Sequence, residues 1–187
     1  MGIIQLLLEK GADPNGADDD GDISLISCSV FQQVEVTQLL LKHGAQVDVA
    51  NNDGKKAIHA AATECDPRMI RLLLEAGADP NITTKPKFWP LRRAVLTSNM
   101  ELLNLLLSHG ADVNLSDSKG RNIVHFACAQ SDANILKRVV EASPDALPQQ
   151  RDDNGGTPLH VAVQNDNEEI TLALMELGGA SKRQRAE

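Results

Sequence analysis

The amino-acid sequence predicts an all-α solenoid of helix–turn–helix units, and three observations carry this prediction. A phrase of three leucines, two variable residues, glycine and alanine recurs with a period of 33 residues. Its glycines are Gly11, Gly44, Gly77 and Gly110. A second glycine series, Gly21, Gly54 and Gly120, keeps the same period, with Lys87 in the missing slot. Aromatic residues make up only 2% of the chain, so the core must be built from small and aliphatic side chains. A fixed period of this length indicates stacked repeats that share one core.

Each repeat is expected to hold two helices. The first is short and rich in alanine, as Ala60-Ala61-Ala62 shows, so that neighbouring helices approach closely. The second carries an apolar stripe at the spacing of one helical face. The stripe consists of Met69, Ile70, Leu73 and Leu74 in one repeat, then Leu102, Leu103, Leu106 and Leu107, then Ile135, Leu136, Val139 and Val140.

The clearest start of a first helix is the segment 155–163, Gly-Gly-Thr-Pro-Leu-His-Val-Ala-Val. Thr157 can cap the helix, and Pro158 suits the first helical position, where the missing N–H has no partner to lose. Weaker copies begin at Gly54, Trp89 and Asn122. Together with the Leu-Leu-x-x-Gly-Ala-Asp-x-Asn phrase, these segments resemble the ankyrin repeat. The resemblance implies a β-turn finger, two antiparallel helices and a loop in each repeat.

The resemblance covers essentially the whole chain and divides it into one domain, residues 1–182, followed by a tail, 183–187. The expected segments are a half repeat at 1–16 and repeats at 17–49, 50–82, 83–115, 116–150 and 151–182. The half repeat supplies only a second helix and leaves Ile3, Ile4 and Leu7 uncovered. We therefore expect a fragment of a longer protein or a covering chain, and self-association through this N-terminal end is one form of such covering.

Charge and cysteine usage restrict the class of protein. The net charge of −8 and the pI of about 5.1 argue against nucleic-acid binding, which needs a basic face. The three cysteines are few and far apart, which indicates neither a disulfide framework nor a zinc site. No apolar run reaches the length of a membrane span, so no membrane insertion is expected. We expect an intracellular protein, cytoplasmic first and nuclear as the alternative.

No arrangement of residues predicts catalysis, a metal or a cofactor. His59, His125 and His160 occupy one slot in three repeats, and stacked layers about 10 Å apart are too distant for shared ligation. The resemblance implies that this histidine makes hydrogen bonds where the turn meets the helix. Cys28 and Cys128 fill small-residue slots, where a thiol is buried and inert. The sequence therefore predicts no enzyme.

The resemblance implies a concave binding surface made by the finger tips and the exposed side of each first helix. The segment 85–93 departs most from the family pattern, because it lacks the turn glycine and the capping threonine and has Arg92 in the histidine slot. Aromatic and arginine residues dominate interface hot spots. The predicted contact residues are Phe31, Lys55, Lys85, Phe88, Trp89, Arg93, Leu96, Lys119 and Arg121. Trp89 can either bind the partner or pack over the neighbouring finger, and the sequence leaves both open.

The predicted function is that of a non-catalytic module that binds a protein or peptide, with an acidic or amphipathic segment as its partner. The alternative is a regulatory or targeting domain from a larger enzyme, channel or effector whose activity lies outside this chain. Asn15, Asn81 and Asn114 each follow a leucine by eight residues. The resemblance implies that such asparagines are candidates for hydroxylation, although they are also ordinary turn residues.

Overall fold

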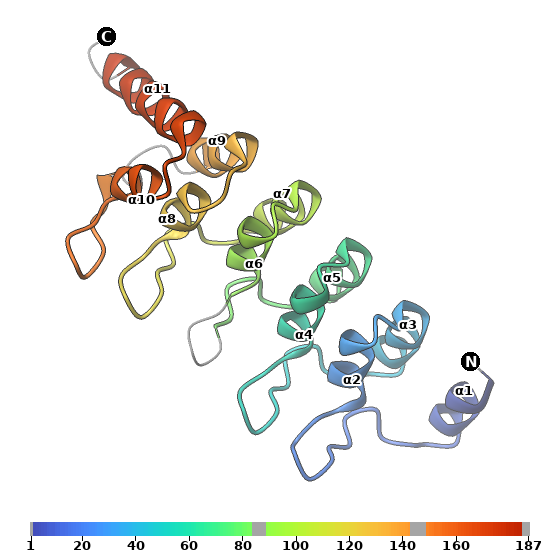
Figure 1. The fold of residues 1–187 in the computed structure, drawn as a ribbon. Coiled ribbons are helices and arrows are strands. Elements are labelled where there is room, and N and C mark those ends of the chain that lie inside the picture. Colours follow the sequence, from blue (N-terminus) through green and yellow to red (C-terminus); the bar gives the residue numbers. More distant parts are fainter. Residues whose placement is uncertain (1, 84–88, 143–148, 185–187) are drawn as a thin grey trace. The chain divides into compact units, whose positions relative to one another are not determined.

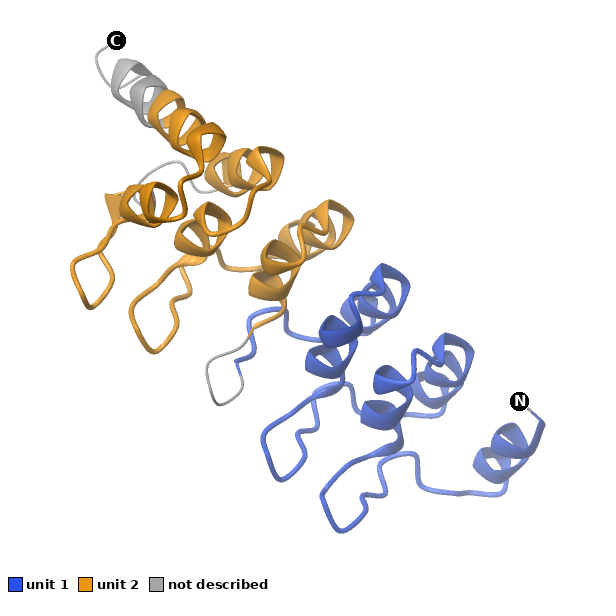
Figure 2. Cartoon of the chain, viewed as in Figure 1, with its two compact units in different colours: residues 1–85 blue, residues 86–187 orange. Residues whose placement is uncertain are grey.

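The computed structural model describes residues 2–83, 89–142 and 149–184, with side chains described up to residue 177. The chain forms two compact units, residues 1–85 and residues 86–187 (Figure 2). The helices of unit 1 are α1 (Gly2–Glu9), α2 (Ser24–Val30), α3 (Val34–Lys42), α4 (Ala57–Glu64) and α5 (Pro67–Glu75). Those of unit 2 are α6 (Pro90–Leu96), α7 (Met100–Ser108), α8 (Ile123–Cys128), α9 (Ala133–Ala142), α10 (Pro158–Gln164) and α11 (Glu168–Gln184).

Within each unit, the helices form pairs that stack on one another (Figure 1). In unit 1, α2 pairs with α3 and α4 with α5, while α2 packs on α4 and α3 on α5. In unit 2, the pairs are α6–α7, α8–α9 and α10–α11, and α8 contacts both α6 and α10. The first helix of the chain, α1, packs against α3 as a second helix without a first. This arrangement confirms the predicted all-α repeat of helix–turn–helix units.

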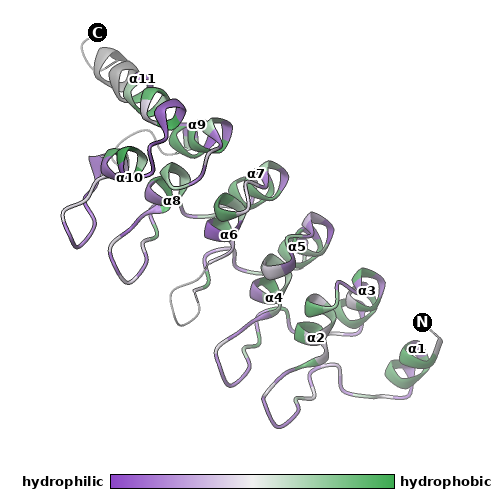
Figure 3. Cartoon of the chain, in the orientation of Figure 1, coloured by the Kyte–Doolittle hydropathy of each residue, from purple (hydrophilic) through white to green (hydrophobic). Residues whose placement is uncertain are grey.

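The two kinds of helix are buried in different ways. All six residues from Ala57 to Ala62 in α4 are buried, because the small side chains allow neighbouring first helices to approach closely. The second helix α5 buries the four apolar residues of its predicted stripe. In α7 the prediction is wrong at one position, since Leu105 is buried and Leu107 is half-buried. Figure 3 shows the apolar helices and the polar fingers that precede α2, α4, α8 and α10.

Each of these four fingers is a turn held by one side chain. The carboxylate or amide oxygen of the residue that opens the turn accepts hydrogen bonds from two backbone N–H groups, two and four residues later. The four residues are Asp18, Asn51, Asp117 and Asp152. Successive fingers are joined by a backbone bond from Asn52 N to Asp20 O (3.1 Å) in unit 1 and from Asp153 N to Lys119 O (3.0 Å) in unit 2.

The periodic histidines link a first helix to the next finger. In unit 1, Nδ1 of His59 accepts from the backbone N–H of Lys56 (3.2 Å), and Nε2 lies 3.0 Å from the carbonyl oxygen of Ile82. His125 makes the same two contacts in unit 2, with Asn122 N (3.2 Å) and the carbonyl oxygen of Gly156 (3.2 Å). These hydrogen bonds confirm the structural role predicted for this slot.

The two terminal helices differ from the inner ones. Ile3, Leu6 and Leu7 of α1 are exposed, as expected for a second helix with no partner. The last helix, α11, extends to Gln184, two residues beyond the expected end of the last repeat. It is also the longest helix among the described residues, with 17 residues against at most 10 in the others.

Candidate protein-binding surface

Trp89 lies at the centre of the best-defined side-chain cluster in unit 2. Its side chain is 0% exposed and meets Phe126 of α8 edge-on, with ring centroids 6.0 Å apart and ring planes at 74°. This edge-to-face geometry is favourable for a pair of aromatic rings. The sequence left open whether Trp89 binds a partner or packs over the neighbouring finger. Its burial supports packing, because a side chain with no exposed area has no surface for a partner to contact.

Two guanidinium groups lie against the Phe126 ring. The guanidinium carbon of Arg92, on α6, lies 4.4 Å from the centroid of the Phe126 ring. The guanidinium carbon of Arg121, in the finger that precedes α8, lies 4.9 Å from the same centroid. Arg92 also lies 5.7 Å from the Trp89 ring centroid. A cation over an aromatic face is attracted by the ring quadrupole, so the two aromatic residues hold both arginines near the surface of unit 2. Burial lowers the pKa of Arg92; the charge of Asp117 opposes this shift and that of Arg121 reinforces it.

Asp117 fixes the position of Arg121. One carboxylate oxygen accepts the backbone N–H groups of Lys119 and Arg121, both at 2.9 Å. The other accepts Nε and Nη2 of the Arg121 side chain, at 2.9 and 2.7 Å. Burial alone would raise the pKa of Asp117, but the hydrogen bonds from Arg121 and Lys119 outweigh it and lower this pKa. The guanidinium of Arg121 is therefore held by an ion pair and by a ring at once.

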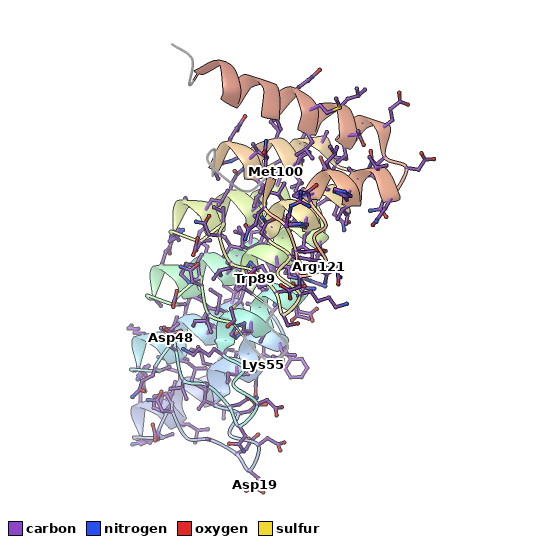
Figure 4. The ribbon with its side chains drawn as sticks, turned by 90° about the vertical axis from the view of Figure 1, so that its left-hand side faces the viewer. Asp19, Asp48, Lys55, Trp89, Met100 and Arg121 are labelled. Carbon is purple, nitrogen blue, oxygen red and sulfur yellow. The ribbon has the colours of Figure 1, made fainter. Side chains whose placement is uncertain are left out.

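The finger that carries Lys119 and Arg121 is also held by its neighbour. Gly120 has a φ of +71°, and a Cβ atom built there would lie 2.6 Å from Oδ1 and 3.1 Å from N of Asp153. Only glycine permits both this backbone conformation and this close approach. Lys119, next to it, is exposed. The finger therefore presents two basic side chains from a backbone with little freedom (Arg121 and Trp89 are labelled in Figure 4).

Unit 1 presents a different surface. Its first finger has the sequence Asp18-Asp19-Asp20-Gly21-Asp22, and Asp19 lies at the tip of the finger (Figure 4). Asp22 accepts a hydrogen bond from the side chain of Asn51 in the next finger at 2.8 Å. Phe31 follows α2 and is 72% exposed, and Lys55 is half-buried in the second finger. The first finger of unit 1 is thus acidic, and the predicted contact residues of this unit are one exposed ring and one half-buried lysine.

The structure separates the nine predicted contact residues into groups. Lys85 and Phe88 lie outside the described residues. Trp89 is buried, whereas Arg93 and Leu96 are half-buried on α6, and Lys119 and Arg121 belong to the described finger of unit 2. Phe31 and Lys55 belong to unit 1. The prediction missed Arg92, Asp117 and Phe126; the signal for Arg92 was its place in the histidine slot, but nothing in the sequence alone joins it to Phe126.

The described residues contain no group of three or more His, Cys, Asp or Glu side chains placed to hold a metal ion. Cys28 and Cys128 are buried, as predicted. Burial raises the pKa of Cys28 and raises that of Cys128 to about 12, which keeps both thiols protonated and unreactive at neutral pH. Among the described helices, none is both long and apolar enough to cross a membrane.

The helix pairs, the fingers and the linking histidines together define a repeat protein. A sequence profile of the family "Ankyrin repeats (3 copies)" matches residues 1–84 and 91–186. The chain therefore belongs to the ankyrin-repeat family, whose members generally act as protein–protein interaction modules. A comparison with curated proteins gives no significant match.

Proposed function

We propose that this chain is a non-catalytic protein-binding module and that unit 2 docks an acidic segment of a partner protein. The observation that carries the proposal is that the guanidinium groups of Arg92 and Arg121 both lie over the Phe126 ring. We propose that their sequence neighbours Arg93 and Lys119 add to this positive charge, and we call the four residues the arginine surface. These four cations come from one helix and one finger of unit 2, in a chain whose net charge is −8. Such a concentration of positive charge favours carboxylates, which arginine binds in a planar geometry.

The ring contacts support binding rather than a purely structural role for Arg121. Its guanidinium is held by Asp117 and Phe126, so little side-chain freedom remains to be lost when a partner binds. Asp117 accepts from two nitrogens of Arg121, and a guanidinium has five N–H donors in all. The remaining N–H groups of Arg121 can therefore donate hydrogen bonds to a partner carboxylate while the ion pair with Asp117 stays intact.

The remaining predicted contact residues are not all part of the proposal. Arg93 belongs to the proposed arginine surface, Leu96 is a further proposed contact on α6, and Phe31 and Lys55 are proposed contacts in unit 1. Lys85 and Phe88 remain predictions from sequence, while Trp89 is left out because its side chain is buried. The N-terminal self-association predicted from sequence also remains a proposal, supported by the exposure of Ile3, Leu6 and Leu7.

The test is a binding titration with two synthetic peptides, one rich in glutamate and one of the same length with glutamine in place of glutamate. We expect the full chain to bind the glutamate peptide, with an affinity that falls as salt is added. Arg121→Gln should weaken this binding by about tenfold or more, which is about 1.4 kcal/mol. The matched control is Arg138→Gln on α9, which removes the same charge from unit 2 at a position bonded to Asn104.

Equal binding of the two peptides, or equal losses for Arg121→Gln and Arg138→Gln, would overturn the acidic-partner proposal. Arg121→Lys keeps the charge and removes the planar group that stacks on Phe126. Comparing its affinity for the glutamate peptide with that of Arg121→Gln therefore separates the effect of the charge from the effect of the planar guanidinium. A regulatory or targeting role in a larger intracellular protein would use the same surface, and the peptide titration tests the surface in either setting.

A further inference from the structure

Two of the described fingers share one backbone structure and carry opposite charge. One opens at Asp18 before α2, and the other opens at Asp117 before α8, three repeat periods later. In both fingers the opening side chain accepts two backbone N–H groups, and the fourth residue is a glycine with positive φ. The two fingers therefore have matching shapes. An antiparallel backbone bridge also closes the base of each, between Ala17 and Ile23 and between Ser116 and Asn122.

The charges of these two fingers are opposite at corresponding positions. Asp20 corresponds to Lys119, and Asp22 corresponds to Arg121. Residues 18–22, which we call the acidic finger, contain four aspartates, and no other five-residue stretch of the chain contains four carboxylates. Within this sequence, the acidic finger is therefore the segment whose charge best complements the arginine surface.

The acidic finger is accessible and rigid. The carboxylate of Asp18 is used within the turn, and that of Asp22 accepts a hydrogen bond from Asn51. Asp19 and Asp20 are exposed, and their carboxylates take part in no hydrogen bond or ion pair among the described residues. A hydrogen bond of 3.1 Å ties the backbone carbonyl of Asp20 to the next finger. Two carboxylates are thus presented from a fixed backbone, which loses little freedom on binding.

The arginine surface can bind such carboxylates. Lys119 is exposed, and so is 36% of the Arg121 side chain. Arg121 already binds one aspartate of a finger, since its Nε and Nη2 donate to Asp117 at 2.9 and 2.7 Å. Its remaining N–H groups can donate to a second carboxylate. Arg92 places a second guanidinium over the same Phe126 ring, so the positive charge here exceeds that of one aspartate.

We propose that the acidic finger of one copy of this chain docks on the arginine surface of a second copy. This inference rests on the proposed function and names the partner of the same site. Because the two surfaces in contact are different, the contact is heterologous, and the mass of the assembly rises with concentration. The net charge of −8 repels copies at long range, but at about 0.1 M salt charges more than about 10 Å apart are largely screened.

The experiment measures the mass of the full chain by sedimentation equilibrium over the micromolar range at about 0.1 M salt. We expect association that is reversed by added salt and by the glutamate peptide, which competes for the arginine surface. Asp20→Lys should weaken association by about tenfold or more, because it reverses a charge at the contact. The turn should tolerate this change, since the finger before α8 has Lys119 at the corresponding position.

The matched control for Asp20→Lys is Asp53→Lys. Asp53 is exposed and holds the corresponding position in the finger before α4, so the control makes the same change of size and charge in the same turn. It lies outside the acidic finger and should leave association unchanged. Far-UV circular dichroism of both variants should show unchanged helix content, because both side chains are exposed.

A mixture of two variants tests which surfaces meet. Asp20→Lys impairs the acidic finger and keeps the arginine surface, whereas Arg121→Gln impairs the arginine surface and keeps the acidic finger. Each variant alone should associate about tenfold more weakly than the wild-type chain. An equimolar mixture should form pairs with the affinity of the wild-type contact, because one copy supplies an intact acidic finger and the other an intact arginine surface.

A wild-type chain that stays a single copy at every concentration would overturn the proposal, as would equal losses for Asp20→Lys and Asp53→Lys. A mixture no heavier than the separate variants would refute the pairing of the acidic finger with the arginine surface. Association that survives Asp20→Lys and is lost on Leu6→Glu would assign the contact to the N-terminal end instead. A single-copy chain that still binds the glutamate peptide would refute this inference alone, whereas a chain that binds neither would refute the proposed function as well.

Discussion

Helix α4 of unit 1 and helix α6 of unit 2 are both first helices of their repeats but differ in one slot, which α8 of unit 2 again fills with a histidine, His125. In α4 of unit 1 the slot holds His59, which is buried and bonded to Ile82 of the next finger. In α6 of unit 2 the same slot holds Arg92, whose guanidinium lies over Phe126. A neutral ring that joins two parts of the backbone is thus replaced by a cation that stacks on an aromatic residue. Arg92 thus contacts a neighbouring element, as His59 does, and adds a positive charge near the surface.

Two individual fingers, one from each unit, differ in the same direction. The first finger of unit 1 carries four aspartates and no basic residue, whereas the finger that precedes α8 carries Lys119 and Arg121 around Asp117. The turn itself is common to both, since one side-chain oxygen accepts two backbone N–H groups in each. The comparison teaches that the repeat tolerates opposite charge at its tips, because the turn depends on the residue that opens it and on its glycine and not on the charged side chains between them.

The largest expected effect concerns the aromatic cluster of unit 2. Trp89→Ala should lower the free energy of unfolding by about 3 to 5 kcal/mol, because it leaves a cavity beside Phe126. Phe31→Ala in unit 1 removes an exposed ring and should change stability by no more than about 0.5 kcal/mol. Urea unfolding followed by circular dichroism measures both. A small loss for Trp89→Ala would contradict its role as the packing centre of unit 2.

The next effect should be shared by the two units. Gly21 and Gly120 both have positive φ and lie against the next finger, with a built Cβ 2.7 Å from Asn52 Oδ1 and 2.6 Å from Asp153 Oδ1 respectively. Gly155 also has positive φ, but no atom of the described part of the chain lies within 4 Å of the position of its Cβ. Alanine at any one of the three positions should lower the free energy of unfolding by about 1 kcal/mol through backbone strain. At Gly21 and Gly120 the steric clash with the next finger should lower it by about 1 to 3 kcal/mol more. Equal Tm losses at Gly120 and Gly155 would show that the fingers separate easily.

A third effect depends on pH and tests the histidine slot. Burial is the largest cause that lowers the pKa of His59 and of His125 in the fold. The unfolded chain, with a histidine pKa of about 6.5, therefore takes up protons first as the pH falls. The stability contribution is complete above about pH 6.5 and is lost as the pH falls toward the folded pKa. Unfolding measured between neutral and mildly acidic pH should show this loss, and His59→Gln with His125→Gln should flatten it.

The smallest expected effect is a gain of stability in unit 1. Thr37 of α3 is buried, and its Oγ1 has no hydrogen-bond partner among the described residues, whereas the corresponding slots of α7 and α9 in unit 2 hold Leu103 and Leu136. Thr37→Val removes the unpaired hydroxyl without a change of shape and should raise the free energy of unfolding by about 1 kcal/mol. Thermal unfolding measures the gain. A lower Tm would show that the hydroxyl is satisfied in solution.

The stripe of the second helices shows how far sequence periodicity reaches. It predicted the buried set in α5 and α9, because residues three and four apart on a helix share one face. In α7 it failed at one leucine, since five of the six residues from 102 to 107 are leucines and surround the helix, so that neighbouring elements decide which of them is buried. The candidate surface was predicted less completely. Lys119 and Arg121 were named from the sequence, whereas Arg92, Asp117 and Phe126 were not.

The sequence by itself determined the repeat, the order of helices and fingers, and the histidine slots, because these depend on spacing along one helix or one turn. Only the tertiary structure decided that Trp89 is packed, that Phe126 holds two arginines, and that Val163 and Met175 are exposed. Each of these facts depends on residues from different helices or different repeats. Burial and ring contacts are properties of pairs distant in sequence, and a period of 33 residues specifies which slots meet without specifying what the particular side chains there do.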